Sequence, residues 1–194
     1  MVEPFLLHFF AMSAHAYTRG SVVTPDVADI TDRDQPAGAY HAAAVVAAPV
    51  YLKWMLCFEE PETRTLWLAK ATPRDWLALG ETPLQAANLT TRYGRVSFTL
   101  AASPNRTVYS VRASVSLPLS MAASGPEGGV RVRIRAPSQY AGRLSGVEVG
   151  GVAWTHFSAA EESVDIPREL LTEDLIKNGL KSIVATFDNS VDTM

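Results

Sequence analysis

The fold is decided by residues 66–100, which include Leu66-Trp67-Leu68, Thr72-Pro73-Arg74-Asp75-Trp76-Leu77 and Thr91-Arg92-Tyr93-Gly94-Arg95-Val96-Ser97-Phe98. The first run is apolar and typical of a short strand. The second has proline where the first turn of a helix tolerates it, and Gly80 then ends the turn. The third leads from a turn into an alternating strand. This stretch therefore predicts a junction between a helical segment and a β-rich segment.

After the junction, apolar and polar residues alternate with a period of two, which indicates strands with one solvated face. Gly150-Gly151 predicts a two-residue hairpin, and other Gly- and Pro-rich turns separate the strands. Regular short strands of this kind predict an antiparallel β-sandwich of about eight strands, a mainly β fold, over residues 65–194. The expected strands are residues 66–68, 95–100, 109–117, 130–135, 146–149, 152–154, 163–166 and 182–187.

Before the junction, residues 1–62 are expected to form two or three helices. Apolar residues recur at helical spacing over residues 3–17 and again over residues 40–58, where Pro49 predicts a kink or a split. Both helices are apolar over much of their surface, which is typical of buried helices. We therefore expect them to need an apolar partner, either further helices of a barrel or a second chain.

The junction motifs resemble the end of the six-hairpin (α/α)6-barrel glycoside hydrolases, of the α-L-rhamnosidase-like kind. In that family a β-sandwich follows the last helices of the catalytic barrel. The resemblance spans roughly residues 17–166 and is most specific at the Leu-Trp-Leu and Thr-Pro-Arg-Asp-Trp-Leu motifs. It implies that this chain is the C-terminal part of such a protein: the last barrel helices of an incomplete barrel, followed by the supporting sandwich domain.

The resemblance also implies a candidate site in the loop between the two helical stretches. Asp26 matches the position of a catalytic or substrate-binding carboxylate, and Arg19 and His41 match substrate-binding positions around it. Glycoside hydrolysis uses two carboxyl groups, and the second would lie on earlier barrel helices. We therefore expect no activity from this chain by itself, and the residues leave open whether it should be called an enzyme.

Several other features have competing interpretations. Trp154, beside His156, has two interpretations: a residue that stacks on a sugar ring, or, more simply, a core tryptophan. Arg131, Arg133 and Arg135 are interpreted as a solvated strand face rather than an anion site. The alternative function is accordingly a stand-alone carbohydrate-binding or adhesive β-sandwich. The binding partner of such a module would be a carbohydrate. The apolar helices argue against this alternative, because a binding module does not need them.

Composition narrows the remaining classes. A net charge of −3 argues against a dedicated nucleic-acid binder, and no apolar window is long enough to span a membrane. The scattered histidines predict no metal site, no motif predicts a cofactor, and Cys57 is expected to be a buried thiol. The apolar run from Phe5 could serve as the core of a signal peptide, but Glu3 and the lack of a basic residue favour a helix, and the cell compartment stays open. Asn88 and Asn105 begin glycosylation triplets that matter only in a secretory pathway.

Overall fold

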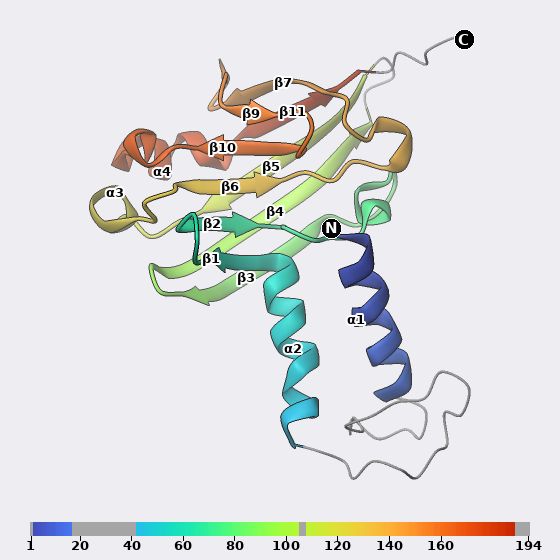
Figure 1. Ribbon diagram of the computed structural model, residues 1–194. Coiled ribbons are helices and arrows are strands. Elements are labelled where there is room, and N and C mark those ends of the chain that lie inside the picture. The colour runs from blue at the N-terminus through green and yellow to red at the C-terminus, as the bar shows by residue number, and fades with distance from the viewer. Residues whose placement is uncertain (1, 17–41, 105–107, 189–194) are drawn as a thin grey trace. The chain divides into compact units, whose positions relative to one another are not determined.

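The computed structural model describes residues 2–16, 42–104 and 108–188, and it divides into two compact units. The first unit spans Met1–Met55 and the second spans Leu56–Met194. The chain as described contains four α-helices and two sheets of five and six strands, so the protein is mainly β (Figure 1).

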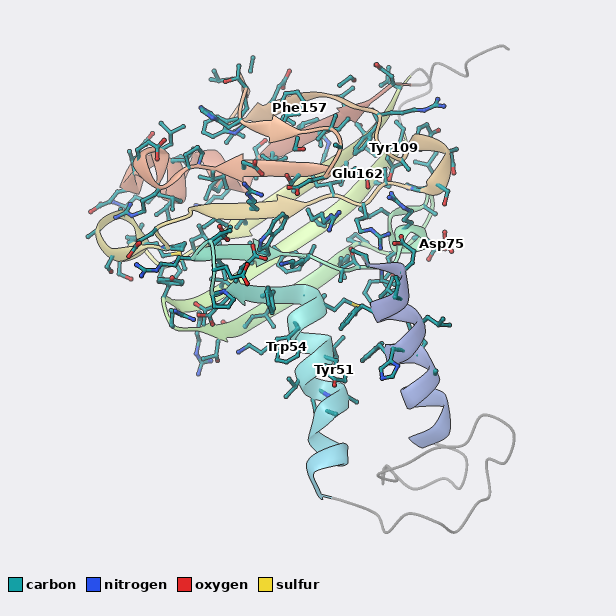
Figure 2. All side chains as sticks on the ribbon, in the orientation of Figure 1. Tyr51, Trp54, Asp75, Tyr109, Phe157 and Glu162 are labelled. Carbon is teal, nitrogen blue, oxygen red and sulfur yellow. The ribbon has the colours of Figure 1, made fainter. Side chains whose placement is uncertain are left out.

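The first unit consists of the helices α1 (Glu3–Ala16) and α2 (Ala42–Leu56). Their packing is aromatic: the Phe5 ring lies 6.4 Å from Phe9 on the same helix and meets the Tyr51 ring of α2 edge-on at 6.2 Å. Tyr51 and Trp54 both project from α2, with ring centroids 5.6 Å apart (Figure 2). The helix continues through Pro49 as one element, so of the two predicted alternatives, a kink or a split, the split does not occur.

The second unit contains two sheets with strand orders β1-β2-β6-β10-β9 and β3-β4-β5-β11-β7-β8. The five-stranded sheet is formed by β1 (Cys57–Glu60), β2 (Thr65–Leu68), β6 (Val130–Arg133), β10 (Ser163–Ile166) and β9 (Phe157–Ser158). The six-stranded sheet is formed by β3 (Leu84–Thr91), β4 (Gly94–Pro104), β5 (Tyr109–Ser116), β11 (Ile183–Phe187), β7 (Leu144–Val149) and β8 (Val152–Ala153). The short helices are α3 (Met121–Ser124) and α4 (Glu173–Lys177), with 3-10 turns η1 (Arg74–Leu77), η2 (Ser138–Tyr140), η3 (Arg168–Leu170) and η4 (Gly179–Lys181).

Strand pairing departs from the prediction in one place. Among the described strands every pair is antiparallel except β2 and β6, which run parallel with Trp67 opposite Arg131. The chain leaves β2, builds β3, β4 and β5 of the other sheet, and then returns beside β2. Such a crossover between sheets brings the returning strand back in the same direction, and no local sequence pattern reports it.

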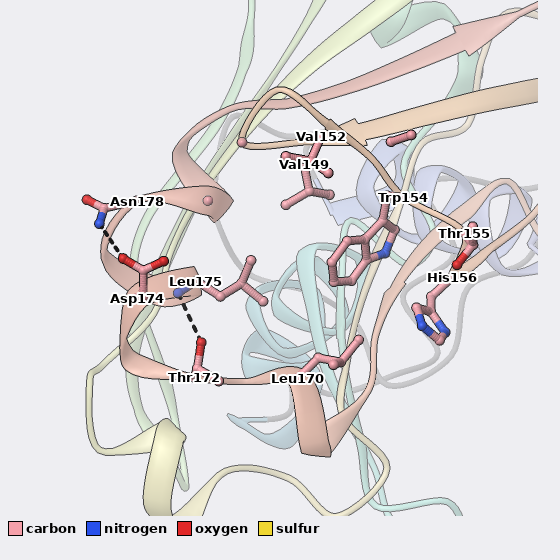
Figure 3. Close-up of a pocket in the computed structure, with 13 residues that line it drawn as sticks. Val149, Val152, Trp154, Thr155, His156, Leu170, Thr172, Asp174, Leu175 and Asn178 are labelled. Carbon is pink, nitrogen blue, oxygen red and sulfur yellow. Dashed lines mark hydrogen bonds between the residues drawn. The ribbon is translucent and has the colours of Figure 1, made fainter.

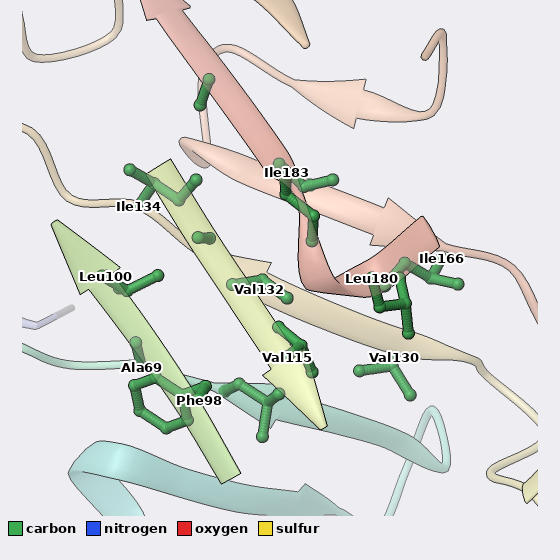
Figure 4. Packing of buried hydrophobic residues seen from close by; sticks show 14 of the residues in the cluster. Ala69, Phe98, Leu100, Val115, Val130, Val132, Ile134, Ile166, Leu180 and Ile183 are labelled. Atoms are coloured by element: carbon green, nitrogen blue, oxygen red, sulfur yellow. The ribbon is translucent and has the colours of Figure 1, made fainter. Parts of the chain in front are cut away.

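The two sheets lie one over the other and share a single apolar core (Figure 4). Phe98, Leu100 and Val115 come from the six-stranded sheet, and Val130 and Val132 come from the five-stranded sheet. All five are at most 2% exposed, as expected when the inward positions of alternating strands meet face to face.

The sequence pattern predicts that Trp67, Trp76, Phe98, Val111, Val132 and Trp154 are buried, which is confirmed for four of these residues and wrong for two. Trp67, Phe98, Val111 and Val132 are buried, and so is Cys57 at the start of β1. Trp76 and Trp154 are only partly buried because they lie on connections rather than on inward strand positions. The second predicted helix is also too long. It ends at Leu56, and the residues 57–60 that follow form β1.

The Thr-Pro-Arg-Asp-Trp-Leu turn is anchored to this unit by its arginine. The guanidinium of Arg74 donates to the carbonyl of Ala136 at 2.6 Å and pairs with both carboxylate oxygens of Glu162 at 3.0 and 2.8 Å. Glu162 is buried, and the backbone N–H of Gly142 also donates to it. The hydroxyl of the buried Tyr109 donates to the carbonyl of Leu77 at the end of the turn, and burial raises the pKa of that hydroxyl (Figure 2).

Candidate ligand-binding groove

A groove of about 630 Å³ lies beside Trp154 at one end of the β unit (Figure 3). The β7–β8 hairpin forms one wall, the segment after β8 carries the tryptophan, and the segment from η3 to η4 forms the opposite wall. Its volume is in the range of about 300–1,000 Å³ that is usual for small-molecule sites. The side chains that define it are Val149, Val152, Trp154, Thr155, His156, Leu170, Thr172, Asp174, Leu175 and Asn178.

Trp154 is held in one orientation by three contacts. Its backbone N–H donates to the carbonyl of Val147 at 2.8 Å, and its indole Nε1–H donates to the carbonyl of Asp165 at 2.9 Å. The His156 ring meets the indole edge-on at 5.6 Å. Since its polar N–H already has a partner, the part of the indole that faces the groove is apolar and preorganised.

The hairpin opposite is shaped by Gly150-Gly151, whose φ angles are +61° and +81°. Both angles lie in the left-handed region that a two-residue hairpin turn of this kind requires and that glycine adopts without strain. The prediction of this hairpin from the sequence is confirmed, with Val149 paired to Val152. The tight turn brings these two valines to the edge of the groove (Figure 3).

The other wall depends on the short helix α4. Thr172 caps the helix by accepting a hydrogen bond from the backbone N–H of Leu175 at 3.2 Å. Asp174 and Asn178 are one turn apart and are joined by a 2.8 Å hydrogen bond from the amide Nδ2 to the carboxylate Oδ1. Leu170 and Leu175 add apolar surface between these polar groups and the tryptophan (Figure 3).

A second hollow of about 440 Å³ lies beside the five-stranded sheet and shares Thr155 and His156 with the groove. Arg131 and Asp165 line it, and their charged atoms are 3.6 Å apart. Arg131 also pairs with Glu161 at 3.1 Å. Because these charges already neutralise one another, this hollow is the weaker candidate for binding a ligand.

The outer face of the five-stranded sheet carries a row of cross-strand contacts around Trp67. Phe58, Trp67, Arg131 and Asp165 follow one another across four strands in register. Lys70 lies 4.3 Å from the Phe58 ring centre and 5.0 Å from that of Trp67. These contacts explain why an outward tryptophan is only 5% exposed, and they assign this face a structural role.

The arginine strand differs from its interpretation as a solvated face. Arg133 donates from Nε to the carbonyl of Glu161 at 2.9 Å, and Arg131 is paired as described above. Arg135 is only 2% exposed and donates to the carbonyl of Thr72 at 2.7 Å. The solvated interpretation of Arg135 is therefore wrong, because the chain has left β6 after Arg133 and turned that side chain inward.

The site predicted from the family resemblance consists of three residues between the two helical stretches. Arg19, Asp26 and His41 are all outside the described residues, so their roles stay predictions. Sequence reasoning raised Trp154, beside His156, as a residue that stacks on a sugar ring, but it missed Asp174 and Asn178. A short helical turn over residues 169–177 can be recognised in the sequence, but it does not reveal what the helix faces.

Neither a metal-binding cluster nor a membrane-spanning helix occurs among the described residues. No group of three or more His, Cys, Asp or Glu side chains there could hold a metal ion. No helix within those residues is long and apolar enough to cross a membrane. Comparisons of the chain with protein-family models, with curated proteins and with solved structures gave no match.

Proposed function

We propose that the β unit is the C-terminal β-sandwich domain of a glycoside hydrolase-like protein, where it supports a helical catalytic barrel. In this proposal α1 and α2 are the last helices of that barrel. The observation that carries it is the apolar surface of the helices: Leu7 is 75% exposed, Phe10 49% and Leu52 41%. The choice of this family comes from the resemblance of the Leu-Trp-Leu and Thr-Pro-Arg-Asp-Trp-Leu motifs.

The exposed helical side chains favour a missing partner on energetic grounds. Burying a leucine or phenylalanine side chain is worth about 1.5–3 kcal/mol, so leaving several of them in water forgoes a large stabilisation. Clusters of exposed apolar residues commonly mark interaction sites. Further barrel helices or a second chain would cover them, whereas a stand-alone binding module has no use for such a pair.

The anchored turn at the junction gives additional support. Arg74 and Leu77 are tied into the β unit, while Asp75 remains exposed and Trp76 is partly exposed (Figure 2). A turn whose two ends are fixed presents its middle residues in a defined geometry. This arrangement suits a supporting domain that presents a rigid surface to a catalytic barrel.

The proposal implies that this chain has no glycosidase activity by itself. Hydrolysis needs an acid and a second carboxylate about 5–10 Å apart across the bond, and acid–base assistance alone contributes roughly 10²- to 10⁴-fold. The candidate contributor from the family resemblance is the Asp26 loop. Two acids of the β unit, Glu60 and Glu162, are engaged in structural hydrogen bonds.

The experiment is to assay the purified full chain, beside an Asp26→Asn variant, on aryl rhamnosides, glucosides, arabinosides and glucuronides. No turnover above the buffer rate is expected for either protein. Turnover that disappears in the variant would show a complete site within the chain and would contradict the supporting role. Activity that persists in the variant would equally contradict it.

A second candidate function is the stand-alone carbohydrate-binding or adhesive module. One observation favours it, namely the groove at Trp154, whose tryptophan is partly exposed rather than in the core. The two functions differ in whether they require the apolar surface of the helices. A binding module would remain fully active after the exposed leucines of α1 and α2 are replaced by polar residues.

A further inference from the structure

We propose that the groove beside Trp154 binds one pyranose ring of a neutral sugar. This inference does not depend on the supporting role proposed above, because the groove is built entirely from residues of the β unit, and it names the ligand of the second candidate function. It would hold whether the helices belong to a barrel or not. The argument rests on the shape of the groove, on its aromatic wall and on its polar rim.

The aromatic wall matches the apolar face of a pyranose. The ring of such a sugar presents several C–H bonds on one side, and these carry a small positive charge. The face of an indole is negative, so the two surfaces attract one another and exclude water between them. Trp154 is suited to this contact because its Nε1–H is already bonded to Asp165 and does not compete for water.

The apolar residues around the tryptophan limit where the ring can lie. Val149 and Val152 come from the hairpin, and Leu170 and Leu175 come from the opposite wall (Figure 3). Together they flank the aromatic surface from two sides. A flat ligand about as large as the indole would therefore contact hydrophobic groups along its edges and on one face, as small-molecule sites usually require.

The polar rim matches the hydroxyl groups. Asp174 offers carboxylate oxygens as acceptors, and Asn178 offers both a donor and an acceptor, with the two side chains held together by their 2.8 Å hydrogen bond. Neighbouring hydroxyls of a sugar can bridge such a pair, each donating to one group and accepting from the other. Thr155 and His156 provide further polar atoms on the tryptophan side.

The charge of the groove selects among sugars. Asp174 is the acidic side chain among the described residues that line the groove, and those residues include no lysine or arginine. A carboxylate on the ligand would lie near this like charge without a compensating cation. A neutral pyranoside is therefore the expected ligand, and a uronic acid should bind more weakly.

The experiment is a titration of the full chain with methyl glucoside, galactoside, mannoside and rhamnoside, and with glucuronate, followed by saturation-transfer NMR and by tryptophan fluorescence. At least one neutral pyranoside should bind with a weak affinity, with a Kd of about 1–10 mM. If none of the five sugars gave a binding signal at concentrations well above the expected Kd, the proposal would be overturned. A preference for glucuronate would also overturn it.

Variants locate the binding. Trp154→Ala should weaken the best sugar by at least about tenfold, and Trp154→Phe should weaken it less because an aromatic face remains. Trp54→Ala, in the helical unit, is the matched control and should leave the affinity unchanged. Equal affinities in the wild-type chain and the Trp154→Ala variant would place the sugar elsewhere and refute the site.

A second pair of variants changes acidic residues and leaves the apolar surface of the groove unchanged. Asp174→Ala removes an exposed rim carboxylate and should weaken binding about threefold to tenfold, in keeping with one lost charge-assisted hydrogen bond. Glu173→Ala, which lies next to it outside the groove, should have no effect. If Asp174→Ala binds as the wild type does while both variants unfold like it, the groove is not a sugar site.

Discussion

Glu60 carries a carboxylate that three donors hold on the outer face of the five-stranded sheet. Trp67 Nε1 donates to it at 2.9 Å, Lys70 Nζ at 3.0 Å and Thr63 Oγ1 at 2.9 Å. The hydrogen bond from Trp67 is the main reason that the pKa of Glu60 falls from 4.5 to about 2, and the bonds from Lys70 and Thr63 lower it further. The folded state therefore favours the ionised form.

This lowered pKa predicts a defined dependence of stability on pH. A carboxyl group with a depressed folded-state pKa stabilises the fold above its unfolded pKa and loses that contribution as pH falls through the folded value. The window for Glu60 lies between about pH 5 and about pH 2. Its contribution is about 1–3 kcal/mol, because the side chain is partly exposed and solvent screens part of the interaction.

The test is urea unfolding at about pH 7, 4 and 2 of the wild type, of Glu60→Gln and of Glu62→Gln. Glu60→Gln should be less stable near neutrality and should lose less stability on acidification. Glu62 is exposed in the adjacent turn, so the Glu62→Gln variant should have the same stability as the wild type at each pH. If all three proteins lost the same free energy of unfolding between pH 7 and 2, the role assigned to Glu60 would be wrong.

Breaking the ion pair between Arg74 and Glu162 should destabilise the fold more than removing the carboxylate of Glu60. Arg74→Met would leave the buried carboxylate of Glu162 without its cation, and breaking such a pair costs about 3–5 kcal/mol. Arg64→Met is the matched control, since Arg64 pairs with Glu127 where both side chains are mostly exposed. Replacing it should cost at most about 1 kcal/mol. Thermal unfolding of the two variants compares the costs, and equal costs would contradict the structural role of Arg74.

Among the elements, the connection into β6 contains a crowded glycine with a positive φ, Gly129. Gly129 has a φ of +76°, and a Cβ atom there would lie 2.3 Å from the carbonyl oxygen of Ile166 on the neighbouring strand. Gly142 has nearly the same φ of +71° but open space around it. The two positions therefore separate backbone strain from steric overlap.

We expect Gly142→Ala to cost about 1–2 kcal/mol, which is the price of a left-handed backbone for an L-residue. Gly129→Ala should cost about 1–3 kcal/mol more, because the sheet must shift to accommodate the methyl group. Chemical denaturation of the two variants gives the difference. Equal free energies of unfolding would mean that the β6–β10 contact is looser than described.

The strands that sequence reasoning missed share one property. β1, β9 and β3 were not expected as strands, and each lies at an edge of its sheet. Edge strands have one free side and are often short, charged or bulged, which weakens the alternating pattern. In β3 the register shifts between Ala86 and Leu89, with Asn88 at a φ of +55°. The eight strands that were expected include the central ones, where burial imposes strict alternation.

The groove was predictable only in part for a related reason. Trp154 and the Gly150-Gly151 turn are visible in the sequence, because an aromatic residue after a hairpin signal is a local feature. Asp174 and Asn178 reach the same groove only because β10 and η3 carry the chain across one end of the unit. Contacts between segments some twenty residues apart follow from the pairing of the sheets and not from local periodicity.

At the scale of the whole molecule, the two units differ in how they bury their apolar residues. The β unit has a core in which Val96, Leu100, Val111 and Ile183 are fully buried. The helical unit exposes large apolar side chains on both helices, including Leu7 and Leu52. Since burial provides most of the stability of a fold, the β unit should be stable by itself and the helices should open more easily in isolation.

Amide hydrogen exchange on the monomeric full chain tests this difference most directly. The account predicts that amides in the central strands β4, β5 and β11 exchange only by global unfolding. Amides over residues 5–11 and 50–54 should exchange faster by orders of magnitude, because their helices lack the surface that would cover them. Protection of the helical amides equal to that of the central strands, in a chain that remains monomeric, would contradict the account.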